Sequence, residues 1–242
     1  MESIGKFMIF LGQQFTRMES FKTYAKRVVD EAILIGYNSL PLFAIIATFM
    51  GAVTTLQTAY NLVSPLVPLY IVSMVVRDMT LLELAPTIMA IVFAGKVGSN
   101  IAGELGTMRI TEQIDALEVM GINATSYLVL PKIIASILTY PMLVVFSGFL
   151  TILGGYLISL ATGVLTGTEY IYGIRYEFVQ FNVSFALIKS VAFGFLVAAI
   201  SAYKGYYTVG GALEVGKSST SAVNNSCIAI LVADYVLAQL LI

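Results

Sequence analysis

The sequence predicts an all-α membrane protein with an N-terminal interfacial helix and five membrane-spanning helices. Of its 242 residues, 58% are hydrophobic and only 11% are charged, whereas soluble domains carry about 25% charged residues. A folded core of this size cannot enclose so many apolar side chains, which indicates that a lipid bilayer surrounds much of the chain. The apolar residues also fall into separate runs of roughly 20, a length that crosses a bilayer as one helix.

Residues 1–30 are predicted to form an amphipathic helix that lies in the membrane interface. Its apolar residues recur at steps of three or four, and basic residues fill other positions, as in helices whose basic face meets lipid headgroups. The apolar set is Ile4, Met8, Leu11, Phe15 and Met18. The alternative is an ordinary amphipathic helix that packs on protein.

Residues 31–242 are predicted to form a single transmembrane domain. We place its five spans at about residues 42–63, 83–106, 133–161, 183–203 and 222–241. Pro65 and Pro68 end the helix after the first span. A continuous helix over residues 69–106 would be too long for one crossing at 1.5 Å per residue, so we expect a break or kink near residues 77–86.

The basic residues predict how the spans are oriented. With a cytoplasmic N-terminus, nine of the 13 lysines and arginines lie on the cytoplasmic side, and two, Arg77 and Arg175, lie outside. An excess of basic residues marks the cytoplasmic loops of membrane proteins. The N-terminus is therefore predicted to be cytoplasmic and, after five spans, the C-terminus to lie on the other side.

Residues suited to covalent or metal chemistry are scarce. The chain has no histidine and one cysteine, Cys227, so it lacks the usual near-neutral acid–base group and any metal-ligand spacing. We therefore expect no catalytic residues, no metal ion and no cofactor in this chain, and do not expect an enzyme. The net charge of −1 gives no overall field that would attract nucleic acid.

One motif matches a nucleotide-binding pattern but lacks its context. Residues 211–218, GALEVGKS, fit G-x-x-x-x-G-K-[ST] letter for letter. A P-loop needs a buried strand before it and a helix after it, whereas a membrane span precedes this segment. We interpret it as a Gly-rich turn, followed by Ser218, Ser219 or Thr220 capping the last helix.

Four ionisable residues lie inside the predicted spans, where a charge costs at least about 2.5–3.5 kcal/mol. Lys96 and Glu104 share one helix face with Asn100, because the three follow at steps of four. Two interpretations stay open for this face: it contacts substrate or acts as a gate, or it is a structural polar seam in which Lys96 snorkels. Lys189 and Asp234, on consecutive spans, are predicted to pair chiefly for structural reasons.

Residues 107–121 are predicted to leave the membrane as a short amphipathic helix that ends at Gly121. An acidic stripe suits an anionic bilayer poorly, so we interpret this helix as the docking site of a cytoplasmic protein with a basic groove. Its apolar stripe is Ile110, Ile114, Leu117 and Met120, and its acidic stripe is Glu112, Asp115 and Glu118.

Two segments resemble the MlaE (YrbE) family, the permease subunits of MCE/Mla-type phospholipid ABC transporters. They are residues 83–121, ELAPTIMAIVFAGKVGSNIAGELGTMRITEQIDALEVMG, and residues 209–226, VGGALEVGKSSTSAVNNS. The resemblance, over roughly residues 30–242, implies a homodimer in the bacterial inner membrane, with its C-terminus in the periplasm. It implies a cytoplasmic ATPase partner that uses the ATP, and an MCE-domain periplasmic protein. The substrate would be a glycerophospholipid moved between the inner and outer membranes.

The resemblance also assigns residues. Glu104 matches the Glu of the family's E-[IL]-G run, near a cavity between two copies, and Gln57 matches the Gln of an L-Q motif, with Tyr60 close by. Together with Asn100, these are the predicted substrate-binding residues. Residues 107–121 match the coupling helix, with Glu112, Asp115, Leu117, Glu118 and Met120 toward the ATPase. Lys96 stands where many relatives have Arg, which keeps the charge but not a bidentate contact.

Two other functions are considered on the residues alone. One is an ion- or proton-coupled secondary transporter of an amphipathic solute, with Glu104 or Asp234 binding the proton. The absence of an inverted repeat and of paired broken helices disfavours it. The other is a non-transporting membrane scaffold, which the intramembrane charges disfavour.

Overall fold

The structure is a computed structural model that describes residues 2–14, 21–62 and 68–241. Five helical stretches are long and apolar enough to cross a membrane: Tyr24–Asn61, Tyr70–Ile110, Thr125–Thr162, Gln180–Tyr206 and Ala212–Leu241. No strand occurs among the described residues. The predicted all-α fold with five spans and an N-terminal helix is therefore confirmed.

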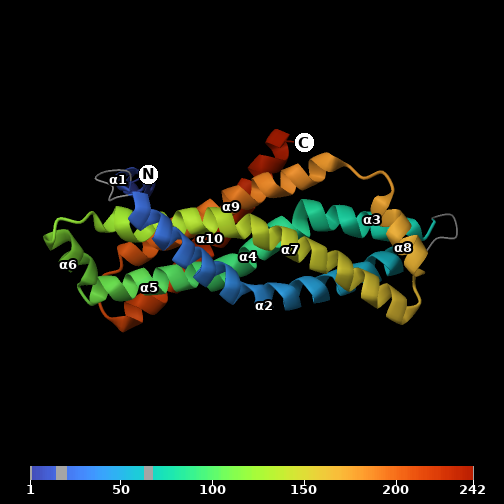
Figure 1. The fold of residues 1–242 in the computed structure, drawn as a ribbon, viewed down its shortest axis with the longest axis horizontal. Helices are drawn as coiled ribbons and strands as arrows, with labels where there is room; N and C mark the ends of the chain where they lie inside the picture. The colour runs from blue at the N-terminus through green and yellow to red at the C-terminus, as the bar shows by residue number, and fades with distance from the viewer. Residues whose placement is uncertain (1, 15–20, 63–67, 242) are drawn as a thin grey trace.

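The elements follow one another along a bundle that Figure 1 shows lengthwise, with α6 at one end and α8 at the other. We call these the α6 end and the α8 end. The elements are α1 (Glu2–Gln13), α2 (Phe21–Asn61), α3 (Tyr70–Met79), η1 (Thr80–Ile88), α4 (Met89–Phe93), η2 (Ala94–Gly98), α5 (Ser99–Ile110), α6 (Gln113–Val119), η3 (Thr125–Val129), α7 (Leu130–Thr162), α8 (Gly167–Arg175), α9 (Gln180–Tyr206) and α10 (Ala212–Leu241).

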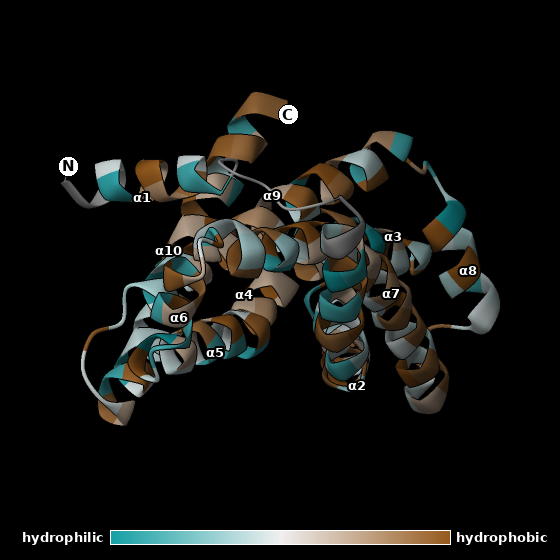
Figure 2. Cartoon of the chain, turned by 60° about the vertical axis from the view of Figure 1, so that its left-hand side comes forward, coloured by the Kyte–Doolittle hydropathy of each residue, from teal (hydrophilic) through white to brown (hydrophobic). Residues whose placement is uncertain are grey.

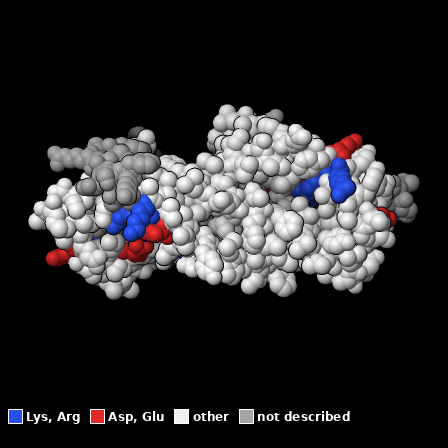
Figure 3. All heavy atoms as spheres, in the orientation of Figure 1, with Lys and Arg blue, Asp and Glu red and all other residues white. Residues whose placement is uncertain are grey.

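The surface agrees with a bilayer as the surrounding solvent. Large apolar side chains point outward in mid-span, such as Phe49 on α2 (69% exposed), Met142 on α7 (72%) and Val232 on α10 (60%). Hydrophobic residues recur along the bundle, with hydrophilic ones interspersed on several helices (Figure 2). Charged side chains on the face in Figure 3 gather toward the two ends, with an uncharged region between them.

The helix predicted over residues 1–30 is divided in the structure. α1 ends at Gln13, and the next described helix, α2, already begins at Phe21 and runs on through the first span. The predicted span of 42–63 therefore starts too late, and Phe15 and Met18 lie outside the described residues. The cause is tertiary, because polar residues at the start of α2 form hydrogen bonds with η3, the segment that precedes α7. For example, Tyr24 Oη lies 2.6 Å from Ser126 Oγ of η3.

α1 packs partly on protein, as in the alternative considered above. Phe10 is fully buried, and its ring lies 5.5 Å from that of Tyr203 on α9. Met8 and Ile9, by contrast, are each 63% exposed. One face of α1 therefore joins the protein, and an apolar face remains for the membrane interface.

The second span contains no break, so of the break or kink expected near residues 77–86 only the break is wrong. Tyr70–Ile110 is helical throughout, over 41 residues. The irregularity takes the form of a π-helical segment, η1, that contains Pro86. A proline has no N–H to donate, and a wider π turn accommodates it without ending the helix. A second π-helical segment, η2, surrounds Lys96 and was not predicted.

Close packing of α2 against α7 fixes the bundle. The Cβ of any residue larger than glycine at Gly51 would overlap the Thr151 carbonyl, and a Cβ at Gly154 would overlap the Thr48 carbonyl. Small residues let spanning helices approach backbone to backbone, where dispersion contacts replace the missing hydrophobic drive. This contact holds the α2 residues described below against the other spans.

Candidate functional site

Two clusters in the spans join a buried lysine to carboxylates on other helices, and the first lies at the α6 end. Lys132, at the start of α7, places Nζ 2.6 Å from Glu31 Oε1 on α2 and 2.8 Å from Glu104 Oε2 on α5. We call Glu31, Glu104 and Lys132 the Lys132 cluster. Only 3% of the lysine side chain is exposed, against 43% for Glu104. One buried cation thus joins three spans, while the Glu104 carboxylate keeps an open side.

The predicted polar face of Lys96, Asn100 and Glu104 is therefore divided. Glu104 belongs to the Lys132 cluster, whereas Lys96 donates from Nζ to the Asn38 carbonyl of α2. Lys96 and Asn100 line a hollow between α2 and the η2–α5 segment. Both interpretations of this face have support, since its Glu104 end is an ion-paired seam and its other end borders an open hollow.

Gln57 and Tyr60 are not brought together with Asn100 and Glu104. They lie near the far end of α2, about 39–44 Å along the helix from Glu31 at 1.5 Å per residue, and Glu31 is the α2 residue in the Lys132 cluster. Both side chains are exposed, Tyr60 by 81%. One chain thus offers two separate polar positions, one on α2 and one on α5, and the role of all four residues in substrate binding stays a prediction.

The second cluster lies deep in the spans around Lys189 on α9. Its Nζ lies 2.6 Å from Asp234 Oδ1 on α10 and 2.9 Å from Glu83 Oε1 on η1, and its side chain is fully buried. We call Glu83, Lys189 and Asp234 the Lys189 cluster. The predicted pairing of Lys189 with Asp234 is confirmed. Thr87 also donates to Asp234 Oδ1, at 3.0 Å.

Glu83 is a member of this cluster that the sequence prediction missed, because it stood at the predicted start of the second span. The π-helical segment η1 explains the contact. In an α-helix the Leu82 carbonyl would accept from residue 86, and Pro86 has no N–H to donate. Lys189 Nζ donates to that carbonyl at 2.9 Å and reaches Glu83 at the same point. The proline in the sequence was the only signal for it.

The helix predicted over residues 107–121 is shorter than expected. α5 continues to Ile110, and Glu112 adopts a left-handed backbone (φ 60°) before α6 begins. Its end is as predicted: Gly121 has φ 80°, and the Ile122 and Gly121 amides donate to Leu117 and Glu118, which is a Schellman motif. α6 is thus a short arm held between two left-handed residues.

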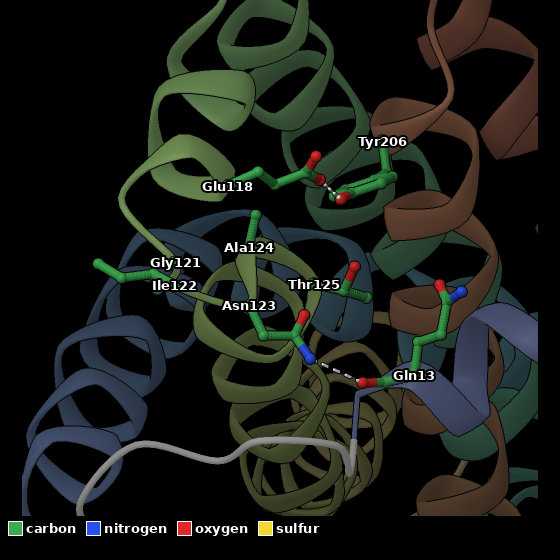
Figure 4. Close-up of a pocket in the computed structure, with 8 residues that line it drawn as sticks. All are labelled: Gln13, Glu118, Gly121, Ile122, Asn123, Ala124, Thr125 and Tyr206. Carbon is green, nitrogen blue, oxygen red and sulfur yellow. Dashed lines mark hydrogen bonds between the residues drawn. The ribbon is translucent and has the colours of Figure 1, made fainter.

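The acidic stripe of α6 is largely engaged within the chain. Asp115 Oδ1 accepts from Arg109 at 2.5 Å, and Glu118 Oε1 accepts from Tyr206 Oη at 2.8 Å (Figure 4). Of the predicted partner-facing residues, Glu112 and Glu118 are exposed, Met120 is 66% exposed and the Asp115 side chain is 49% exposed, whereas Leu117 packs against the core. The free tip of α6 consists of Val119, 89% exposed, and Met120. The docking surface thus combines this apolar tip with the exposed acidic residues, and its role in binding an ATPase stays a prediction.

A cavity of about 400 Å³ lies behind α6, next to the end of α1. Asn123 Nδ2 donates to the Gln13 carbonyl at 3.0 Å across its rim (Figure 4). The Tyr206 hydroxyl, on α9, closes another side through its bond to Glu118. α6 is thereby tied to α9 as well as to α5.

The segment that matches the P-loop pattern is helical. α10 begins at Ala212, directly after a turn that follows α9, so the strand that a P-loop requires is not there. Ser218 donates to the Lys204 carbonyl at 2.7 Å and closes the α9–α10 turn. The prediction that residues 218–220 cap the last helix is wrong, because the helix starts earlier.

Comparisons with known proteins agree with this architecture. The family model described as "Permease MlaE" matches residues 28–240. The chain is 37% identical over 239 residues to a probable ABC transporter permease protein of Rickettsia bellii, covering 99% of this chain and 92% of the relative. It is 34% identical over 230 residues to a probable ABC transporter permease protein of Synechocystis sp., covering 95% and 87%.

A plant protein is also similar. The chain is 33% identical over 240 residues to the chloroplastic protein trigalactosyldiacylglycerol 1 of Arabidopsis thaliana, covering 96% of this chain and 66% of the relative. The family match and the five spans give the same conclusion. The chain belongs to the MlaE permease family and is a multi-pass membrane protein, the permease subunit of an ABC transporter.

Proposed function

We propose that this permease moves glycerophospholipids between the inner and outer membranes of a bacterium, driven by a separate ATPase. The observation that carries the proposal is α6, an arm outside the spans that is joined directly to α5 and bonded to α9. α5 carries Asn100 and Glu104. Movement of α6 by an ATPase would thus act directly on a span that borders an open polar hollow.

The substrate class is argued from the surface of the spans. A polar position beside apolar, outward-facing helix surface suits a molecule with a polar headgroup and apolar tails. The name of the Arabidopsis relative contains that of a glycerolipid, trigalactosyldiacylglycerol, which supports a lipid substrate for this chain too. The headgroup would meet Asn100 and Glu104, and Gln57 and Tyr60 would contact the lipid at the other end of α2.

The assembly follows from the same surfaces. We place the α6 end in the cytoplasm, where the ATPase would dock on the α6 tip, and the α8 end toward the periplasm, where an MCE-domain protein would bind. In the most apolar stretch of α10 only 17% of the residues are buried in one chain, and in that of α2 only 28%. The remaining surface of these two helices leaves room for a second copy. The ATP would be used by the partner, and this chain would bind no cofactor.

The proposal is tested by lipid transfer from vesicles that contain the permease with its ATPase. Glu104→Ala should lower ATP-dependent transfer of a fluorescent phospholipid several-fold while the ATPase still co-purifies. Glu214→Ala, on the exposed start of α10, is the matched control. Transfer at the wild-type rate in Glu104→Ala would reduce Glu104 to a structural role, and the absence of any ATP-dependent transfer by the wild type would reject the function.

A proton-coupled transporter is the second candidate, and the Lys189 cluster favours it. One lysine faces two carboxylates there, and ionisable residues within spans mark the proton relays of pumps and transporters. An imposed proton gradient without ATP would then drive transfer, and Asp234→Asn would abolish it. Transfer that needs ATP and ignores the gradient excludes this candidate.

A further inference from the structure

The hollow between α2 and the η2–α5 segment combines a cavity with unused polar groups. It encloses about 180 Å³. Three apolar and four polar residues line it. The apolar ones are Leu34, Ile35 and Val97, and the polar ones are Asn38, Ser39, Lys96 and Asn100. Pockets that enclose a whole drug-sized ligand measure about 300–1,000 Å³, so this one admits a small polar group rather than a whole lipid.

Lys96 brings a positive charge that no carboxylate neutralises among the described residues. Lys132 and Lys189, two buried lysines in the spans, each contact two carboxylates. Lys96 is half-buried and donates to the Asn38 carbonyl alone. An ammonium group has three N–H donors, so two remain. A charge within a span is costly unless an anion compensates it, which makes an anion the matching ligand.

Ser39 adds a second, independent sign of a ligand. Its side chain is 1% exposed, and its Oγ has no hydrogen-bond partner in the described part of the chain. Thr48 and Thr54 on the same helix satisfy their hydroxyls by donating to the carbonyl four residues earlier, as helical Ser and Thr commonly do. Because Ser39 does not, it is a residue of the hollow's lining whose buried hydroxyl has no partner in the described part of the chain.

The backbone beside the hollow is also unusual. Lys96 lies in η2, one of three π-helical segments among the described residues, and such segments are frequent at functional sites. Asn100, one turn further along, is exposed at the rim with its amide group. Leu34, on the α2 side of the rim, is 46% exposed. The hollow thus opens beside apolar surface and ends on Lys96 and Ser39.

We infer that this hollow binds a phosphate group, with Lys96 as its counter-ion and Ser39 and Asn100 as hydrogen-bond donors. Resting on the proposed function, we assign the phosphate to a glycerophospholipid whose tails lie against the apolar surface beside Leu34. Inorganic phosphate is the other source of the same chemistry. Lys96, which would hold the phosphate, lies about 12 Å along the helix from Glu104, and Asn100 lies between them, so the rest of the headgroup would extend toward Glu104.

A photo-cross-linking amino acid at Leu34 tests the assignment in the full chain, in vesicles with ³²P-labelled phosphatidylglycerol. Lys96→Met should lower the labelling about tenfold and Ser39→Ala roughly threefold, since each removes one hydrogen-bond donor, charged in the first case. Lys96→Arg should retain most of it. Ser136→Ala, which removes another buried partnerless hydroxyl, should have no effect.

The same cross-linker at Phe49, an exposed mid-span position on α2, reports lipid contact and correct insertion for every variant. Labelling at Leu34 that is equal in wild type and Lys96→Met, with Phe49 labelling normal, overturns the site. Competition by dihexanoyl phosphatidylglycerol supports the lipid source, whereas competition by inorganic phosphate alone rejects it. Normal Leu34 labelling in a complex that transfers no lipid would reject the proposed function and keep the site.

Discussion

Removing Glu31 and Glu104 together should destabilise the chain much more than the two single changes add up to. Lys132 Nζ contacts both carboxylates, and only 3% of its side chain is exposed. Either single alanine leaves the buried lysine with one counter-ion. Because the carboxylate side chains are 23% and 43% exposed, each single change should cost about 1 kcal/mol or less.

The double variant leaves a buried ammonium group unpaired, which costs about 3–5 kcal/mol. The coupling energy between the two glutamates is then about 1–3 kcal/mol. For a chain of this size about 1 kcal/mol shifts the melting temperature by roughly 2–4 °C. We therefore expect shifts of a few degrees for the single variants and roughly 10 °C for the double variant.

The single cysteine supplies the assay. Cys227 is partly buried on α10, so a thiol-reactive fluorescent dye reports its exposure as the detergent-solubilised chain is heated. Adding Lys132→Met to the double variant removes the unpaired charge and should recover most of the lost stability. Strictly additive shifts, or no recovery in the triple variant, would refute the reasoning that Lys132 needs one carboxylate but not both.

Three further changes test other parts of the structure. Gly154→Val should prevent α2 from packing on α7 and lower the melting temperature by 5 °C or more, as for about 2 kcal/mol, whereas Gly216→Ala, with open space around it, should not. Changing Val119 and Met120 to Asp should release the ATPase at unchanged melting temperature; intact co-purification would remove the apolar tip from the docking surface. Lys217→Ala should leave nucleotide binding by the isolated chain at background, and ATP binding that this change abolishes would restore the P-loop interpretation.

Much of the fold could be predicted from the sequence because the relevant signals are local. The length of an apolar run by itself shows whether the run can cross a bilayer. Gly121 ends α6 because glycine readily adopts the left-handed backbone conformation. The errors arose where a neighbour decides. α2 begins about 20 residues before its predicted span because polar residues such as Tyr24 find partners near the start of α7. Pro86 widens its helix instead of breaking it, since α9 supplies a donor to the freed carbonyl.

The candidate site could be predicted only in part. Its ionisable residues were recognisable because charges inside apolar runs are costly wherever they pair. Their partners were not: Glu31 and Lys132 are separated by 101 positions, and Glu83 and Lys189 by 106. The acidic residues of α6 were recognised as a stripe, yet Asp115 and Glu118 bond within the chain to residues that the helical period does not indicate.

The sequence by itself determined that this chain is a membrane permease of five spans with an arm after the second. Hydrophobic length and backbone turns depend on neighbouring residues in the chain. Only the tertiary structure decided which charges neutralise one another, because that depends on which helices become neighbours. In the described part of the chain, Lys132 pairs with two carboxylates, whereas Lys96 pairs with none and lies beside a hollow. Two lysines that both lie in apolar runs of the sequence therefore acquire different roles.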